Sequence, residues 1–371
     1  MIIGHLSDTH LGAYAGRDEE REQDYYEAFQ EAIEIFIREH TKLVIHSGDI
    51  LDSSKPYGTA MRVLVEGVKR LDEKGIRFVF TLGEHDISNV PSTPHPNILG
   101  ILGLANYIGT GEPLVIGDIV VAGLHKYKKV ERETLCEKLK GVAKKAKQVD
   151  GKKRILVLHQ GLTELREFAG EISKYDIPAE FDYYAMGHFH MFHEFRHGNG
   201  LGSYPGATHW VDWSDSETSF VNLVDLSADE PKINKVRLES VRPRIEKDIK
   251  FEELGTLVQN LTSISHKNRK RPCLMIRVET SKPFDPKSLE DSLSAFYIVT
   301  IKQLLKEVGR EVIHEAPDVD AELMRLVESV LGSKEKAEFA LFELLKVLND
   351  EDWKKGALEL IWKIFREGRL R

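Results

Sequence analysis

Five short apolar runs in the first 240 residues each end near a glycine, an aspartate or a histidine. They read IIGHLS, KLVIHS, RFVFTLG, RILVLHQ and DYYAMGH. Runs of this length that stop at turn-forming residues are typical of buried β-strands. Residues 18–40 and 58–75 instead carry apolar side chains at three- and four-residue spacing, which predicts amphipathic helices. The first begins with acidic residues and the second ends on Gly75, as helix termini commonly do.

The order of these elements predicts a layered α/β domain over residues 1–240, because strands and helices alternate along it. Within this domain, residues 190–240 hold short apolar stretches separated by turn residues, which favours antiparallel strands. A small mixed α+β segment is predicted to form a second domain over residues 241–310. Residues 311–371 have almost only helical periodicity and are predicted to form a helical tail.

Composition limits the class of protein. The chain has 371 residues, of which 41% are hydrophobic and 30% charged, as is typical of a folded globular protein. No apolar run reaches the length of a membrane span, and the first residues resemble a strand rather than a signal peptide. Two cysteines without metal-binding spacing indicate a cytoplasmic location. A net charge of −8 excludes a diffuse basic surface, so any contact with DNA or RNA would have to come from local patches and bound metal ions.

Polar side chains stand where each predicted strand ends. Asp8 and His10 follow the first strand, and His188 and His190 repeat their spacing after the last. Residues two apart in an extended chain point to the same side, so the two side chains of each pair should face the same region. Three further polar residues occupy the ends of the other strands: Asp49, Glu84 and His159. Because α/β sheets place sites beyond the carboxyl ends of their strands, we expect all seven side chains to meet in one region.

These seven side chains offer carboxylate oxygen and imidazole nitrogen, a combination that suits Mn²⁺, Fe or Zn²⁺. Seven ligands are too many for one ion. With one carboxylate shared, they match two ions about 3.5–4 Å apart, which is the spacing of two-metal phosphoester hydrolysis. The sequence therefore predicts a two-metal phosphodiesterase centre.

The succession D-x-H, G-D, G-x-H-D, H and G-H-x-H resembles that of the calcineurin-like metallophosphoesterases over about residues 1–210. SDTHLG near the N-terminus, YPGAT at 204–208 and VRPRIEKDI before the second domain are similar to the archaeal meiotic-recombination-eleven/SbcD family of DNA double-strand-break repair nucleases. This closer resemblance extends to about residue 305. It implies a four-layer α/β/β/α sandwich with a small α+β capping domain and a helical C-terminal tail.

The resemblance also implies how the side chains divide between two Mn²⁺ ions, with other divalent metals as alternatives. One ion would be held by Asp8, His10 and His190, and the other by Glu84, His159 and His188. Asp49 would bridge them. His85 would contact the scissile phosphate or protonate the leaving oxygen, and Asp86 would orient it. General acid catalysis of this kind contributes about 10²–10⁴-fold to a rate.

Two positions depart from the pattern of that family. Glu84 stands where the family usually has asparagine, so the site carries one more negative charge. We expect Glu84 to bind the second ion more tightly and to weaken its pull on an anionic phosphodiester, which gives a retuned site. Asp52 follows Asp49 by three residues, where many relatives have a histidine that helps to position the substrate. This departure puts one positive or polar contact with DNA in question.

Other histidines and lysines have simpler explanations. A histidine inside an apolar strand is usually a hydrogen-bonded core residue, which is our interpretation of His5 and His46; His193 and His197 are expected to be structural or surface residues. Two basic runs, HKYKK and SHKNRKRP, fit a solvated loop as well as a phosphate-binding patch. The candidate DNA contacts are Lys55, Lys126, Lys128, Lys267 and Arg269.

The predicted function is that of a Mn²⁺-dependent DNA nuclease with single-strand endonuclease and 3′-to-5′ exonuclease activity. The resemblance implies that it processes breaks as a homodimer, with a coiled-coil SMC-like ABC ATPase, at the nucleoid and without a membrane. Two alternatives remain open. One is a generic metallophosphodiesterase, against which residues 243–371 argue. The other is a scaffold that tethers DNA ends and has a weakened metal site, which Glu84 and Asp52 favour.

Overall fold

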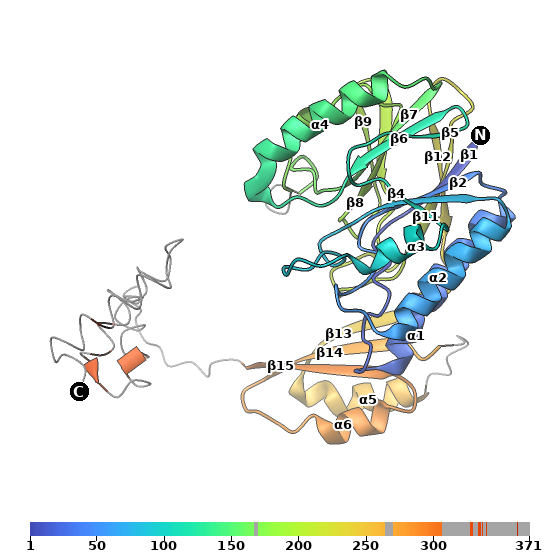
Figure 1. Cartoon of the computed structure of the whole chain (residues 1–371). Coiled ribbons are helices and arrows are strands. Elements are labelled where there is room, and N and C mark those ends of the chain that lie inside the picture. The colour runs from blue at the N-terminus through green and yellow to red at the C-terminus, as the bar shows by residue number, and fades with distance from the viewer. Residues whose placement is uncertain are drawn as a thin grey trace. The chain divides into compact units, whose positions relative to one another are not determined.

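The structure is a computed structural model of the chain, and it describes residues 1–166, 170–263 and 270–305 with a few single positions beyond 305. The chain divides into two compact units (Figure 1). The first consists of Met1–Glu279 and Phe284–Leu304 and contains nearly all of the helices and strands given below. The second consists of Thr280–Pro283 and Leu305–Arg371. The predicted helical tail, 311–371, lies outside the described residues apart from single positions.

The first sheet has six strands in the order β12-β11-β1-β2-β3-β4. Its strands are β1 Ile2–Leu6, β2 Leu43–Ser47, β3 Arg77–Thr81, β4 Asn106–Tyr107, β11 Phe220–Asp225 and β12 Lys232–Arg237. β1 to β4 pair in parallel, and β11 and β12 extend the sheet with antiparallel pairing. Parallel neighbours require crossovers, and α1 (Glu19–Arg38) and α2 (Gly58–Glu73) supply the first two. The short helix α3 (Ile98–Ile101) precedes β4.

The second sheet also has six strands, in the order β5-β6-β7-β8-β10-β9. Its strands are β5 Leu114–Ile116, β6 Ile119–Leu124, β7 Lys153–His159, β8 Tyr183–Gly187, β9 His193–His197 and β10 Gly200–Tyr204. β6, β7 and β8 are parallel, and α4 (Arg132–Lys147) connects the first two of them. The parallel strands of both sheets thus bring their carboxyl ends, and the residues that follow them, to the site described below.

Three hydrophobic clusters separate four layers, so the fold is the α/β/β/α sandwich that the resemblance implied (Figure 1). One cluster joins the helices α1 and α2 to the first sheet and includes Phe36 and Phe78. A second joins α4 to the second sheet and includes Leu139 and Tyr184. The third fills the space between the sheets and includes Ile3, Val79 and Val157.

Two histidines lie inside the core. His5 lies between the sheets, where Nδ1 is 2.7 Å from the Tyr183 hydroxyl and Nε2 is 2.9 Å from Oγ of Ser47. Burial lowers the pKa of His5 to about 3, so its ring is neutral. His46 is also buried, with Nε2 3.0 Å from Oγ1 of Thr9. The interpretation of both residues as hydrogen-bonded core histidines is confirmed.

Residues 244–305 hold a third sheet, in the order β13-β14-β15. Its strands are β13 Arg244–Lys250, β14 Cys273–Thr280 and β15 Ile298–Leu305. Two helices, α5 (Leu254–Ser263) and α6 (Lys287–Leu293), share a separate hydrophobic cluster with this sheet. The predicted boundary at residues 240 and 241 falls just before β13. The division into a nuclease domain and a capping domain stays a prediction, because most of this segment belongs to the same compact unit as the two large sheets.

A buried cluster of charges, which we call the Asp24 cluster, links α1 to the start of this third sheet. The Asp24 carboxylate lies 2.7 Å from Nη1 of Arg21, 2.6 Å from Nε of Arg242 and 3.0 Å from Nζ of Lys270. The Arg21 guanidinium also lies 3.9 Å from the ring centre of Trp210. The Asp24 carboxylate is thus surrounded by positive side chains of the protein itself.

The predicted elements are confirmed where the structure describes them. α1 and α2 occupy the two segments with helical spacing, and the Asp18 side chain caps α1 by accepting from the N–H of Arg21 at 3.0 Å. Gly75 follows α2 with a φ of +69°, a conformation that favours glycine. The pairs β9–β10 and β11–β12 are antiparallel, as expected. None of the helices in the described part of the chain is long and apolar enough to cross a membrane.

Candidate metal centre

The seven side chains predicted as metal ligands follow the ends of β1, β2, β3, β7 and β8, and the structure brings them together. Both large sheets contribute to the site. Their ligand atoms form overlapping groups, within each of which all atoms lie within 4.8 Å of one another. We call the seven residues the metal centre: Asp8, His10, Asp49, Glu84, His159, His188 and His190.

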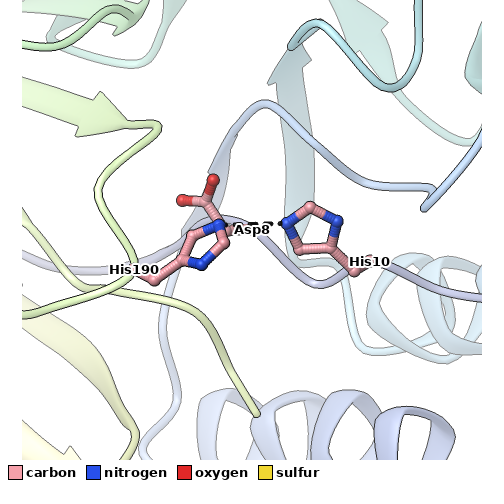
Figure 2. Close-up of side chains that lie close together, drawn as sticks. All are labelled: Asp8, His10 and His190. Atoms are coloured by element: carbon pink, nitrogen blue, oxygen red, sulfur yellow. Dashed lines mark hydrogen bonds between the residues drawn. The ribbon is translucent and has the colours of Figure 1, made fainter. Parts of the chain in front are cut away.

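The first group contains Asp8, His10 and His190 (Figure 2). The Nε2 atoms of His10 and His190 face each other at 3.3 Å, and the Asp8 carboxylate lies beside them. Nδ1 of His190 is 3.1 Å from Oδ2 of Asp215. A histidine that donates through Nδ1 presents the lone pair of Nε2, the form in which it binds a metal.

The second group contains Glu84, His159 and His188. Nδ1 of His159 donates to the Ser47 carbonyl at 2.8 Å, which leaves Nε2 as an acceptor. That Nε2 is buried without a hydrogen bond, although Oε2 of Glu84 lies only 2.9 Å away. The other Glu84 oxygen lies 3.0 Å from Nδ1 of His188. An unpaired ring nitrogen beside a carboxylate is the arrangement that a cation between them would satisfy.

Asp49 belongs to two of the overlapping groups of ligand atoms. It forms one group with Asp8 and His159 and another with Glu84 and His85. Its Oδ2 lies 3.3 Å from Nε2 of His159, and its Oδ1 accepts from the N–H of His85 at 2.9 Å. This carboxylate therefore occupies the position that a bridging ligand requires.

The backbone at the ligands is unusual. Asp8, His10, Asp49 and His188 all have positive φ angles, of 52°, 43°, 51° and 98°. Residues other than glycine rarely adopt this conformation, and they persist in it where the surrounding structure requires it, commonly at functional sites. Gly83 must be glycine for a related reason, because an added Cβ would overlap Oδ1 of Asp49.

The charges of the site fit divalent cations. Burial raises the pKa of Asp49 and Glu84, but His159 outweighs this for both carboxylates and lowers their pKa. Conversely, burial lowers the pKa of His159 and His188, but neighbouring carboxylates raise it above the ordinary histidine value. The carboxylates thus favour positive charge beside them, and a bound divalent cation would supply that charge. Carboxylate and imidazole donors in overlapping groups fit two such ions.

Two acidic residues that sequence analysis missed support the ligands. Asp215 pairs with His190, and that hydrogen bond outweighs burial and lowers the pKa of Asp215 to about 2. Oε1 of Glu171 lies 3.3 Å from Nε2 of His188, and its Oε2 accepts from the N–H of Gly161 at 2.7 Å. Neither residue belongs to a short motif, so no local signal in the sequence distinguishes them.

His85 has a different partner from the one expected. Asp86 was predicted to orient it, but Nδ1 of His85 lies 2.9 Å from the carbonyl oxygen of Asp52. The Asp86 carboxylate is buried and accepts from the N–H groups of Ile50, Leu51 and Gly83 at 3.2, 2.9 and 2.9 Å. Asp86 thus holds together the turns that carry Asp49 and Glu84, and it acts on His85 only through the backbone.

Asp52 also lies at the first group. Its Oδ1 is 3.4 Å from Nδ1 of His10, without a hydrogen bond to that atom. The residue that departs from the family pattern therefore adds a carboxylate to the site, where the resemblance placed a histidine. Its backbone carbonyl meanwhile fixes the ring of His85.

The candidate DNA contacts are divided by the structure. Lys126 is 9% exposed, with Nζ 2.7 Å from Glu171 and 3.6 Å from Glu84, so it pairs with acidic residues of the site. Lys55 and Lys128 are exposed. Lys128 also lines a cavity of about 850 Å³ beside Glu84. Lys267 and Arg269 lie outside the described residues.

The two histidines after the last ligand lie apart from the metal centre. His197 is buried, and its Nε2 donates to the Ile177 carbonyl at 2.7 Å. His193 is half-buried against the rings of Phe189 and Tyr204. The expectation that both are structural or surface residues is confirmed.

Comparison with known proteins agrees with this geometry. Residues 1–192, more than half of the chain, match the family profile described as calcineurin-like phosphoesterase. The DNA double-strand break repair protein Mre11 of Sulfurisphaera tokodaii is 32% identical over 288 residues, which cover 75% of this chain and 73% of the relative. Mre11 of Sulfolobus acidocaldarius is 30% identical, covering 80% and 79%. Mre11 of Methanocaldococcus jannaschii is 27% identical, covering 96% and 97%.

The matched family region contains all seven side chains of the metal centre. The resemblance drawn from the sequence motifs is therefore confirmed, and the chain is a metal-dependent phosphoesterase. It belongs to the calcineurin-like phosphoesterases and, within them, to the Mre11 family of DNA double-strand break repair proteins.

Proposed function

We propose that this protein is a metal-dependent DNA nuclease that hydrolyses phosphodiester bonds at a two-metal centre. The observation that carries the proposal is the place of Asp49, whose carboxylate belongs to one group with Asp8 and to another with Glu84. Two adjacent cations need such a shared carboxylate, and paired cations suit phosphodiester hydrolysis. The relatives named as DNA double-strand break repair proteins support DNA as the substrate.

We propose two Mn²⁺ ions as the cofactors, with one held by the first group and the other by the second. Asp49 would contribute to both. When bound, the ions would supply Lewis-acid polarisation of the phosphodiester and activation of the attacking water. The extra carboxylate of Glu84 would strengthen cation binding at the second group and reduce the net positive charge that faces the phosphate.

His85 is the proposed proton donor to the leaving oxygen. Its Nδ1 is held by the Asp52 carbonyl, which leaves Nε2 for the substrate. Burial lowers the pKa of His85, but the Asp49 carboxylate and the Asp52 carbonyl outweigh this and raise it. A raised pKa favours the protonated ring, the form that a general acid requires.

The cavity beside Glu84 is the proposed entry for the DNA strand. Its lining includes the basic residues Lys126, Lys128 and Lys129, the polar residues Ser88, Asn89 and His125, and the acidic residues Glu84, Glu131 and Glu171. Cationic and hydrogen-bonding side chains suit a phosphate backbone and carry no base preference. We propose single-strand endonuclease and 3′-to-5′ exonuclease activity on such strands, with Lys55 as a further phosphate contact.

We extend the proposal to the partners that the family resemblance implies. Ile101 and Leu102 of the α3 region are 75% and 52% exposed, which supports a homodimer contact there. The helical periodicity of residues 311–371 supports docking to an SMC-like coiled-coil ABC ATPase. Work on chromosomal breaks would place the complex in the cytoplasm at the nucleoid.

The test is cleavage of single-stranded and double-stranded DNA by the purified protein in Mn²⁺ and in Mg²⁺. We expect cleavage in Mn²⁺, and a loss of about 10²–10⁴-fold in His85→Ser with Mn²⁺ affinity unchanged, because His85 serves proton transfer. His40→Ser is the matched control, because His40 is an exposed histidine at the opposite ends of the strands.

Two results would contradict the proposal. Equal cleavage by the wild type and by His85→Ser would remove His85 from the mechanism. No cleavage by the wild type, together with cleavage after Glu84→Asn, would favour a scaffold protein whose phosphodiesterase activity Glu84 has lowered.

A further inference from the structure

The segment from Trp210 to Asp215 lies between a metal ligand and the first strand of the third sheet. None of its residues belongs to the metal centre. Its side chains and carbonyl groups nevertheless contact both His190 and Arg244, which is the first residue of β13. We call this segment the 210–215 turn.

The contact with His190 is made by Asp215. Oδ2 of Asp215 lies 3.1 Å from Nδ1 of His190 and accepts from the N–H groups of Val211 and Asp212 at 2.8 and 2.9 Å. These backbone donors fix the carboxylate within the turn, and the carboxylate fixes the ring. A carboxylate on the far nitrogen orients a ligating histidine and raises its basicity.

The contact with the third sheet is made by Arg244. Its Nη1 donates to the Asp212 carbonyl at 2.9 Å, and its Nη2 donates to the carbonyl of Asp215 itself. The guanidinium also lies 5.2 Å from the ring centre of Trp210 and 5.7 Å from that of Trp213. The Arg244 side chain thus contacts the turn at both of its ends.

The turn is also anchored to the Asp24 cluster. Nε1 of Trp210 donates to the Arg242 carbonyl at 2.9 Å, and Nε of Arg242 donates to Asp24 at 2.6 Å. The 210–215 turn therefore moves with the start of the third sheet, and His190 is attached to it through one carboxylate.

We propose that Asp215 and Arg244 are positioning residues for the first metal ion. Arg244 holds the turn, Asp215 holds His190, and the placement of the third sheet thereby sets the geometry of one group of ligands. The inference rests on the proposed function only in that His190 binds a cation. In the described part of the chain, the residues that support His188 of the second group are Glu171 and Lys126, which come from other segments.

Arg244 is suited to this role by its shape. Two donors of one guanidinium reach two carbonyl oxygens, while its central carbon lies over two indole rings. Lysine has a single ammonium and cannot reproduce this arrangement. Arg244→Lys should therefore be intermediate between the wild type and Arg244→Ala.

The experiment is a Mn²⁺ titration of the full chain, followed by electron paramagnetic resonance of the free ion, with the melting temperature in chelator measured alongside. We expect two bound ions in the wild type. Asp215→Asn should weaken one of them by about 10–100-fold and leave the other unchanged. Arg244→Ala should weaken the same ion by a smaller factor, and the double variant should be no weaker than Asp215→Asn alone.

Arg277→Ala is the matched control, because Arg277 lies on β14 of the same sheet and pairs with Glu246 and Asp248. It should bind both ions as the wild type does. Unchanged binding in Asp215→Asn would overturn the proposal, and so would equal weakening of both ions. If Arg244→Ala melts too early to be measured, Asp215→Asn and Arg244→Lys still decide the question.

The outcomes separate this inference from the proposed function. A wild type that binds two ions but cuts no DNA would refute the proposed nuclease activity. The Mn²⁺ titration of Asp215→Asn would still decide the role of Asp215. A wild type that binds a single ion would refute the two-metal centre, and the inference would then stand or fall on whether Asp215→Asn weakens that ion. A wild type that binds no ion would refute both.

Discussion

The metal centre and the Asp24 cluster are both buried groups of charge, but they are neutralised in different ways. In the Asp24 cluster, one carboxylate is surrounded by two guanidinium groups and one ammonium group. In the metal centre, the buried carboxylates of Asp8 and Asp49 face imidazole rings. Buried carboxylates need compensating charge, because an isolated charge loses the solvation that water provides.

The difference separates a structural cluster from a functional one. The Asp24 cluster supplies its own cations, so it is complete as folded and joins α1 to the third sheet. The imidazoles of the metal centre carry positive charge only when protonated, and they can exchange protons for metal ions. A buried acidic cluster rich in histidine and poor in arginine therefore indicates a site for external cations.

Among the variants that test this comparison, Asp49→Asn should have the largest effect on activity. The change removes the negative charge shared by the two groups, so we expect DNA cleavage to fall by about 10³-fold or more. Mn²⁺ stoichiometry, measured by equilibrium dialysis, should fall below two. Wild-type stoichiometry in Asp49→Asn would show that Asp49 is no bridging ligand.

Asp24→Asn should break the other cluster. Removing one partner of a buried ion pair leaves uncompensated charge, so we expect the free energy of unfolding to fall by about 3–5 kcal/mol. Urea denaturation in chelator measures this loss. The number of bound Mn²⁺ ions should stay at two, and a variant as stable as the wild type would refute the structural role.

The same variant should change the response to acid. Burial raises the pKa of Asp24, but Arg242 and the other cations outweigh this and lower it below the ordinary aspartate value. A lowered folded pKa means that the carboxylate stabilises the fold fully above its unfolded pKa of about 3.9 and loses this effect as the pH falls through the folded value. The stability difference between the wild type and Asp24→Asn should therefore shrink below about pH 4.

Glu84→Asn should have the smallest effect of the three. It removes one negative charge from the second group and keeps one oxygen ligand, so we expect that ion to bind about tenfold more weakly. At saturating Mn²⁺, the rate of DNA cleavage should stay the same or rise, because the phosphate meets a more positive site. A lower rate at saturation would mean that Glu84 contributes more to catalysis than its charge predicts.

The metal ligands that stand at the strand ends were predictable from the sequence. Asp8 with His10 and His188 with His190 stand two residues apart after apolar runs, and this local spacing is visible without a structure. The helices α1 and α2 were predictable for the same reason, because their periodicity is local.

The supporting residues were not predictable in this way. Asp215 meets His190 across 25 residues, and Asp86 reaches the N–H groups of Ile50 and Leu51 across 36 and 35 residues. Contacts between loops depend on how the strands are ordered and leave no periodic signal. The charge of Lys126 suggested DNA, but its surroundings of Glu84 and Glu171 appear only when the two sheets are packed.

The first and the second group each take side chains from both large sheets, and His10 and His190 are separated by 180 residues. A chain that pairs such distant segments closes its long loops slowly during folding. Neither group exists until both sheets have formed and packed together, so cations cannot guide the early steps. Cations bound by these residues would hold the two sheets of the finished sandwich together, and they would slow the opening of the native state more than they speed folding.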